Sequence, residues 1–292
     1  MQPGTTRERI RCRLITEADL GAVARLLCEG FAGRTTRSWE EGLQKLRLRD
    51  VPDGMPRYGY CLDAGGRLVG VILLIASIRP IDGTPAPFAN VASWYVNPDY
   101  RAYAQLLVSI ALRNKDTTYT NISAAPHTWP IVENQGYTRY CEGLFFAAAA
   151  LKSPARDVSV EAFGTRSDHV SIADHALLRR HHDLGCHVLV CREQDQLSGY
   201  VFRRYRIRSG RIALPAMLVI HAPDRERLVR HAGNIGRHFI WSAAPILVMD
   251  SDGPVDGLRG IYTGARGRKY FKGPHRPRLC DLADSEFAIF GV

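Results

Sequence analysis

The sequence predicts an α/β (α+β) protein in which a mixed, mostly antiparallel sheet is flanked by helices, and it predicts this unit in tandem. At 292 residues the chain exceeds the usual size of one domain. Its 46% hydrophobic and 23% charged residues suffice for packed cores. Helical and strand patterns also alternate in an order that the second half partly repeats. We expect domains at residues 1–150 and 166–292, joined by a linker at 151–165 that Pro154 and Gly164 keep irregular.

The first half begins with a short strand and two helices. In RCRLITEADLGAVARLLCEGF (11–31), Thr16 is the expected N-cap, and Asp19 follows at the third helical position as in a capping box. Apolar residues then recur at helical spacing. RSWEEGLQKLRLR (37–49) predicts a second helix that begins at Ser38, because two glutamates in the first turn suit the positive end of the helix dipole.

Strands dominate the rest of the first half. YGYCLDAGG and RLVGVILLIASI flank an Ala-Gly-Gly turn and predict a hairpin over 58–78, and FANVASWYV predicts a strand that stops at Pro98. The following segments predict, in turn, a helix, a strand, a short helix and a final strand region: 100–114, 117–123, 127–135 and 136–150. The predicted order is therefore β-α-α-β-β-β-α-β-α-β.

The second half repeats part of this order, as a helix, a hairpin, a strand, a helix and a strand. RLVG at 67–70 corresponds to QLSG at 196–199, and NPD at 97–99 corresponds to APD at 222–224. The offsets of 129 and 125 residues predict a duplicated unit with small insertions. Chance similarity between two ordinary α/β segments is the alternative.

Composition restricts the location and the chemistry. No apolar run reaches the roughly 18 residues of a membrane span. The N-terminal MQPGTTRERIRCR lacks the apolar core of a signal peptide, so we expect a cytoplasmic protein. Seven cysteines without a CxxC pair predict neither a disulfide framework nor a metal site. In CHVLVC, Cys186 and Cys191 are expected on opposite faces of a strand.

Net charge is +10 and is unevenly distributed. Residues 1–150 hold 17 basic and 14 acidic residues, and the remainder holds 22 and 15, so the second part carries +7. Such a bias suits an anionic partner. No predicted helix gathers its arginines on one face, so nucleic acid ranks behind other partners. GARGRKYFKGPHRPR (264–278) mixes basic and aromatic residues and is expected to be a solvated loop, with a phosphate-binding segment as the alternative.

The first half resembles the GNAT superfamily of acyl-CoA-dependent N-acyltransferases over roughly residues 11–150. The opening strand and helix, the segment GGRLVGVILL, the segment WYVNPDYRAYAQLL and the closing NISAAPHTWPIVENQGYTRY carry the resemblance, and the order of elements matches throughout. The resemblance implies acetyl-CoA or another acyl-CoA as co-substrate. It also implies a small-molecule amine acceptor, which we expect to bind between the opening helices and, if the repeat is real, against the second half.

The cofactor motif of the family matches in part. Val96, Pro98 and Arg101 fit, whereas Ala104 and Leu106 stand where the family has glycines. The resemblance implies that backbone N–H groups of this loop hold the CoA diphosphate and that pantetheine lies along the preceding strand. We expect a helical Leu106 to face the core. The expected cofactor-binding residues are Tyr95, Val96, Arg101, Ala102, Tyr103, Ala104, Gln105 and Leu106.

The catalytic positions depart further from the family. Val132 stands where a tyrosine often protonates the departing thiolate, and Asn90 and Ser93 stand on the strand that often carries a catalytic glutamate. His127 is the candidate acid or base, because its ordinary pKa lies near neutrality. Ser123 is the candidate hydrogen-bond donor to the thiolate or to a substrate amide. Surface or strand-end positions with no catalytic role are the alternatives for both.

Together these features predict an N-acyltransferase that transfers an acyl group directly from CoA to an amine. The second half has acidic Asp224 and Glu226 at the corresponding turn, so we expect it to be degenerate and to bind no CoA. A non-catalytic metabolite- or protein-binding descendant of the same fold is the first alternative, and a nucleic-acid binder is the second.

Overall fold

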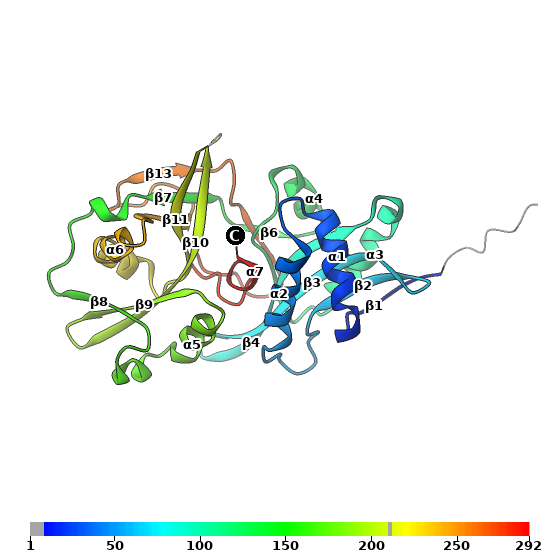
Figure 1. The fold of residues 1–292 in the computed structure, drawn as a ribbon, viewed down its shortest axis with the longest axis horizontal. Coiled ribbons are helices and arrows are strands. Elements are labelled where there is room, and N and C mark those ends of the chain that lie inside the picture. Colours follow the sequence, from blue (N-terminus) through cyan, green and yellow to red (C-terminus); the bar gives the residue numbers. More distant parts are fainter. Residues whose placement is uncertain (1–8, 210–211, 292) are drawn as a thin grey trace, which may run out of the picture. The chain divides into compact units, whose positions relative to one another are not determined.

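The computed structural model describes residues 9–209 and 212–291, and these form two compact units (Figure 1). Unit 1 consists of Met1–Thr120 with Gly273–His275, and unit 2 consists of Asn121–Lys272 with Arg276–Val292. The first eight residues, where the sequence predicts no signal peptide, lie outside the described residues. No helix in the described ranges is long and apolar enough to span a bilayer.

Unit 1 is a sheet flanked by three α-helices. Four strands pair antiparallel in chain order, and a fifth pairs parallel with the fourth. These strands are β1 (Ile10–Leu14), β2 (Gly59–Ala64), β3 (Arg67–Ile81), β4 (Thr84–Val96) and β5 (Thr118–Asn121). The helices are α1 (Leu20–Gly30), α2 (Thr36–Arg47) and α3 (Ala104–Ala111). Helix α1 packs on β3 and β4, and α3 packs on β2 and β3.

Local signals position the two opening helices. The Asp19 carboxylate accepts a hydrogen bond from the Thr16 N–H at 2.8 Å, as the predicted capping box requires. Helix α2, however, begins at Thr36 and not at Ser38. The Thr35 side chain accepts a hydrogen bond from the Ser38 N–H at 3.2 Å, so the threonine is the N-cap and the serine lies in the first turn.

The predicted orientation of Leu106 is wrong. A 3₁₀ helix over Pro98–Tyr103 precedes α3, so the α-helical turn begins at Ala104, later than the predicted start at Tyr100. Leu107 and Val108 therefore face the core, whereas the Leu106 side chain is 40% exposed. The 3₁₀ segment has fewer residues per turn, and this changes which residues of the following helix point inward.

Unit 2 contains a second mixed sheet with the strand order β13-β7-β12-β11-β10-β9-β8. The strands are β7 (Gly143–Ala147), β8 (Val158–Ala162), β9 (His187–Glu193), β10 (Gln196–Ser209), β11 (Ile212–His221), β12 (Ile246–Ser251) and β13 (Gly260–Thr263). Strands β6 (Thr138–Cys141) and β14 (Lys269–Lys272) pair antiparallel with each other. The helices of this unit are α4 (Trp129–Asn134), α5 (His175–Asp183), α6 (Arg225–Ile240) and α7 (Glu286–Phe290).

The two halves share one topology. Strands β8 to β11 pair antiparallel in chain order and β12 pairs parallel with β11, just as β1 to β4 are followed by β5. Strands β3 and β10 begin at Arg67 and Gln196, the first matched landmark, and the second landmark precedes α3 and α6. The structure therefore confirms the predicted fold class, two mostly antiparallel mixed sheets with flanking helices in tandem.

The closing strands depart from simple tandem order. Strand β7, from the first half of the chain, lies between β12 and β13 and pairs antiparallel with both. Strand β14, from the second half, pairs with β6 of the first half. Each half thus supplies a strand that pairs with strands of the other half.

The segment expected as a linker contains a strand. Residues 158–162 form β8, which pairs antiparallel with β9 and opposes Val158 to Glu193 and Val160 to Cys191. The alternating Val158 and Val160 place one face of the segment against the hydrophobic core, and this favours a strand despite the nearby proline and glycine. The proposed limits of the two domains stay a prediction.

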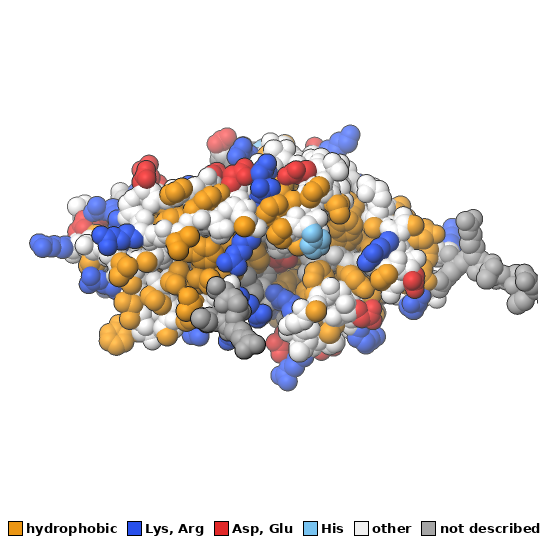
Figure 2. Space-filling model, turned by 90° about the horizontal axis from the view of Figure 1, so that it is seen from above, with side chains coloured by type: hydrophobic (Ala, Val, Ile, Leu, Met, Phe, Trp, Pro, Cys, Tyr) orange, Lys and Arg blue, Asp and Glu red, His pale blue; other side chains and the backbone are white. Residues whose placement is uncertain are grey.

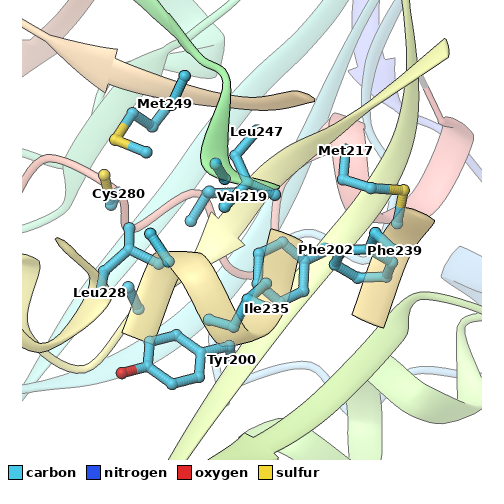
Figure 3. Packing of buried hydrophobic residues seen from close by; sticks show 14 of the residues in the cluster. Tyr200, Phe202, Met217, Val219, Leu228, Ile235, Phe239, Leu247, Met249 and Cys280 are labelled. Carbon is cyan, nitrogen blue, oxygen red and sulfur yellow. The ribbon is translucent and has the colours of Figure 1, made fainter. Parts of the chain in front are cut away.

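Hydrophobic clusters cover both faces of the second sheet. Figure 3 shows one of them, where α6 lies against the sheet and Phe239 meets Phe202 with ring centroids 5.1 Å apart. Cys191 belongs to this cluster and Cys186 to the opposite one, as the odd spacing predicts. Burial raises the pKa of the Cys191 thiol to about 12, so this sulfur packs as an apolar group.

Candidate functional site

Strand β4 carries a β-bulge close to its end. Val71 of β3 pairs with Tyr95, and Leu73 pairs with Ala92, so two residues of β4 lie opposite the single Ile72. The first of the two, Ser93, has φ 50°, in the left-handed region. A bulge bends its strand and interrupts the regular ladder, and bulges recur beside active sites. Beyond the bulge, Tyr95 and Val96 resume pairing with Val71 and Gly70 of β3, whereas β5 pairs with the other edge of β4 only from Phe88 to Asn90.

The turn after β4 leads into α3 through bonds that occupy some of its amide groups. The Tyr100 N–H bonds to the Asn97 carbonyl at 2.9 Å, and the Ala104 N–H bonds to the Arg101 carbonyl. Ala104, predicted as a cofactor contact, therefore has no N–H to offer. Gln105 and Leu106 lie in the first turn of α3, which continues directly from the 3₁₀ helix over Pro98–Tyr103.

The start of α3 carries no side-chain cap, in contrast to the corresponding helix of the second half. Tyr103 occupies the N-cap position of α3 and makes no capping bond. At α6, the Asp224 carboxylate accepts hydrogen bonds from the N–H groups of Glu226 (2.6 Å) and Arg227 (3.3 Å). A carboxylate thus fills the anion position of α6, whereas no side chain does so at α3, where Arg101 and Ala102 are exposed.

The two predicted pantetheine residues differ in their surroundings. Val96 is buried, so only its backbone is available to a ligand. The Tyr95 ring packs over Gly30 at the end of α1, where an added Cβ would lie 2.4 Å from two ring carbons. The absence of a side chain at Gly30 therefore provides the space that the Tyr95 ring occupies.

A groove between α1 and α2 fits the predicted position of the acceptor. Its volume is about 470 Å³, and it lies entirely within unit 1. The groove is lined by Leu20, Gly21, Arg37, Glu40, Glu41, Leu43 and Gln44. Glu41 is paired with Arg37 at 3.1 Å, whereas Glu40 is exposed. A carboxylate in such a groove is complementary to a protonated amine.

The predicted catalytic residues lie in unit 2, in the segment that follows β5. Ser123 is exposed, and its hydroxyl donates a hydrogen bond of 2.6 Å to the carboxylate of Glu286 in α7. His127 lies exposed in a 3₁₀ helix over Pro126–Thr128. The eight predicted cofactor residues, in contrast, form one segment of unit 1. Glu286 was missed because it lies 163 residues from Ser123 and no local pattern marks it.

Neither position that carries an acid or base in the family can transfer a proton here. Val132 is buried in α4. Asn90 is 2% exposed and donates its side-chain amide to the Thr120 carbonyl at 3.2 Å, so it joins β4 to β5. Glu133, also in α4, accepts a hydrogen bond of 3.1 Å from the Tyr270 hydroxyl.

The basic and aromatic segment near the C-terminus is not the predicted solvated loop. Residues 269–272 form β14, and the side chains of Lys269 and Tyr270 are buried. The Lys269 ammonium lies 2.8 Å from the Asp250 carboxylate, itself fully buried. Strand pairing with β6 buries these residues, and the buried carboxylate compensates the charge. In the described ranges, no cluster of His, Cys, Asp and Glu is arranged to hold a metal ion.

The solved structures with the same fold include N-acetyltransferases. A GCN5-related N-acetyltransferase from Anabaena variabilis ATCC 29413 is 11% identical, with a TM-score of 0.58, over 94% of this chain and 74% of that one. Another from Kribbella flavida is 17% identical, with a TM-score of 0.55, over 92% and 72%. A putative acetyltransferase from Pyrococcus horikoshii is 12% identical, with a TM-score of 0.53, over 94% and 92%.

These similarities establish the fold. The chain has the architecture of the GCN5-related N-acetyltransferases, and the likeness extends over both halves because it covers more than nine-tenths of the chain in each case. No protein-family model matches the chain, and no curated protein matches it.

Proposed function

We propose that the protein is a cytoplasmic acyl-CoA-dependent N-acyltransferase that moves an acetyl or other acyl group from CoA to a small-molecule amine. The observation that carries this proposal is the start of α3, which has no side-chain cap and follows the bulged end of β4, while Asp224 caps the corresponding helix of the second half. The first half (1–150) is the active one, and the second half (166–292) is degenerate.

The residues of the loop have separable roles in binding the co-substrate. The N–H groups of Gln105 and Leu106 bind diphosphate oxygens, and the exposed Arg101 guanidinium compensates their charge. Ala102 and Tyr103 form the surface between the arginine and the helix. The backbone of Tyr95 and Val96 pairs with pantetheine, and an N–H near Val96 stabilises the negative oxygen of the tetrahedral intermediate.

The transfer itself requires an uncharged amine held against the thioester. The amine nitrogen bonds to the acyl carbon, the carbon–sulfur bond breaks, the thiolate leaves, and the amine loses a proton. Orientation alone can contribute roughly 7–11 kcal/mol to such a step. Ser123, hydrogen-bonded to the buried Glu286 carboxylate, and His127 are the candidates to receive or supply the proton.

Isothermal titration calorimetry with CoA and acetyl-CoA tests this function. The Arg101→Glu variant should weaken binding at least tenfold, because it replaces an attractive charge at the diphosphate with a repulsive one. Arg11→Glu, at an exposed position on β1 of the same unit, changes net charge equally and should bind like the unchanged protein. Absence of heat with a series of acyl-CoAs of increasing chain length would end the proposal.

A non-catalytic binding protein is the second candidate, and the lost proton-transfer residues favour it. Val132 cannot protonate a thiolate, and Asn90 is committed to the Thr120 carbonyl. A folded protein that binds no CoA would support this candidate. Mass spectrometry of ligands that co-purify with the protein separates the two, because a bound acyl-CoA supports the transferase.

A further inference from the structure

The hairpin of β10 and β11 extends beyond its neighbours as a two-stranded ribbon. Strand β9 pairs with β10 only as far as Phe202, and β12 pairs with β11 only from Ala216 onward. In the described part of the chain, residues 203–208 of β10 therefore pair only with β11, and residues 206–208 lie opposite the part of β11 that β12 does not reach. Figure 1 shows this hairpin projecting past the ends of the adjacent strands.

One face of the ribbon is apolar and the other is basic. Tyr205 and Ile207 pack against a hydrophobic core cluster. The alternate residues Arg204, Arg206 and Arg208 are exposed on the opposite face. Successive arginines are about 6.8 Å apart along the strand, from the rise of two residues. Their partners across the ribbon are Met217, Pro215 and Ala213, none of which carries a charge.

No carboxylate in the surrounding sequence compensates these arginines. Residues 196–221 contain five arginines and no Asp or Glu, and residues 227–249 also contain no Asp or Glu. Figure 2 shows basic side chains distributed among other residues over the face it presents. A strand face that only has to stay soluble usually mixes both signs, because like charges on neighbouring positions repel.

The helix that packs on this side of the sheet, α6, ends in an exposed aromatic ring. Phe239 packs against Phe202, which lies on the same face of β10 as Arg204. Two residues later Trp241 is 92% exposed. His187 lies between the ribbon and the helix, with the Arg204 Nε at 3.4 Å from its ring, and burial followed by the charge of Arg204 lowers the pKa of His187.

We propose that the face of Arg204, Arg206 and Arg208, together with Trp241 at the end of α6, binds single-stranded nucleic acid. The arginines form a line of regularly spaced cations for the phosphates of an extended strand, and the indole ring provides a surface on which an unpaired base stacks. A duplex offers phosphates but no unpaired base for Trp241. This inference goes beyond the proposed acyl transfer and does not depend on it, since none of its residues belongs to the CoA segment.

Fluorescence anisotropy with a labelled oligothymidine measures this binding in the full chain. The triple variant Arg204→Glu, Arg206→Glu, Arg208→Glu should weaken binding at least tenfold at moderate salt. It should also reduce the slope of log affinity against log salt by about 2, because each lost phosphate contact on a single strand contributes about 0.7. Since these side chains are exposed, thermal unfolding should stay unchanged, and the corresponding triple glutamine variant gives a second measurement with a smaller charge change.

A matched control distinguishes an effect of the ribbon arginines from an effect of net charge. Three exposed arginines elsewhere in unit 2 supply it, as the triple glutamate variant of Arg156, Arg179 and Arg259. The control should bind within about twofold of the unchanged protein. An equal loss in both triple variants would overturn the proposal, because binding would then follow total charge alone.

Trp241→Ala tests the preference for a single strand. It should weaken binding of the oligothymidine about tenfold, in the range of one lost stacking contact, and leave duplex binding unchanged. The proposal is overturned if the duplex binds as tightly as the single strand with no effect of Trp241→Ala. It is also overturned if the protein binds phosphatidylserine vesicles and no oligonucleotide.

Discussion

At the scale of single residues, Gly30 is the clearest case in which one missing methyl group positions a site residue. An added Cβ at Gly30 would overlap the Tyr95 ring, whereas at Gly21 of the same helix it would meet only the Arg25 side chain at 3.8 Å. Gly30→Ala should destabilise the protein by about 1–3 kcal/mol through forced repacking. Gly21→Ala should stabilise it by about 0.5–1 kcal/mol, since alanine favours a helix.

Urea unfolding of both variants checks this prediction. Because both glycines lie in α1, helix propensity is the same in the two comparisons, and only the contact with Tyr95 differs. A Gly30→Ala variant as stable as Gly21→Ala would show that the ring moves without cost and that Gly30 does not fix it.

A second residue-scale prediction concerns acid stability. Arg13 forms hydrogen bonds to Asp19 (2.7 Å) and Asp63 (2.8 Å). The hydrogen bond from Arg13, followed by burial that acts in the opposite direction, sets the pKa of Asp19 below its ordinary value. A carboxyl group with a lowered folded-state pKa stabilises the protein above the unfolded pKa of about 3.9, and this contribution is lost as pH falls toward the folded value.

Asp19→Asn should therefore lower the free energy of unfolding at pH 7, by about 1 kcal/mol for a partly exposed pair. As pH falls below the unfolded pKa of about 3.9, the difference should begin to shrink, because the unfolded carboxyl takes up protons before the folded one. Urea unfolding at several pH values measures the difference, which should shrink as pH falls. A difference that stays constant with pH would contradict the assigned role of the Asp19 charge.

At the scale of elements, the starts of α3 and α6 show how one topology can keep or lose an anion site. Ala104→Asp should abolish CoA binding, because a carboxylate at the first turn of α3 competes for the same amide groups as the diphosphate. Calorimetry with CoA measures the loss, while circular dichroism should show an intact fold. Unchanged affinity in Ala104→Asp would place the diphosphate elsewhere.

The reciprocal change at the second helix is the control. Asp224→Ala removes the cap of α6 and should cost about 1 kcal/mol of stability without changing CoA affinity in the first half. A gain of a second CoA site in this variant would mean that the second half lost its activity only through Asp224.

At the scale of the whole molecule, the sequence predicts the order of the elements better than it predicts which strands pair. The sequence predicts the hairpin after Ala64 and the strands that begin at Arg67 and Gln196. These features depend on turn residues and on the alternation of apolar and polar residues within short segments. The partners of β7 and β14 depend on residues more than 95 positions away, where no local pattern acts. The same reason explains why Ser123 was identified and its partner Glu286 was not.

The strand exchange leads to the last prediction, that neither half folds cooperatively alone. A fragment of residues 1–150 would expose both edges of β7, which lacks β12 and β13, and would leave β6 without β14. In the complementary fragment, β14 lacks its partner β6. The ion pair between Lys269 of β14 and Asp250 would therefore lose part of its cover. Mixing the two fragments should restore a cooperative thermal transition, since the exchanged strands supply the missing hydrogen bonds. Calorimetry of each fragment and of the mixture measures this, and a cooperative transition in the first fragment alone would favour an independent domain that ends at residue 150.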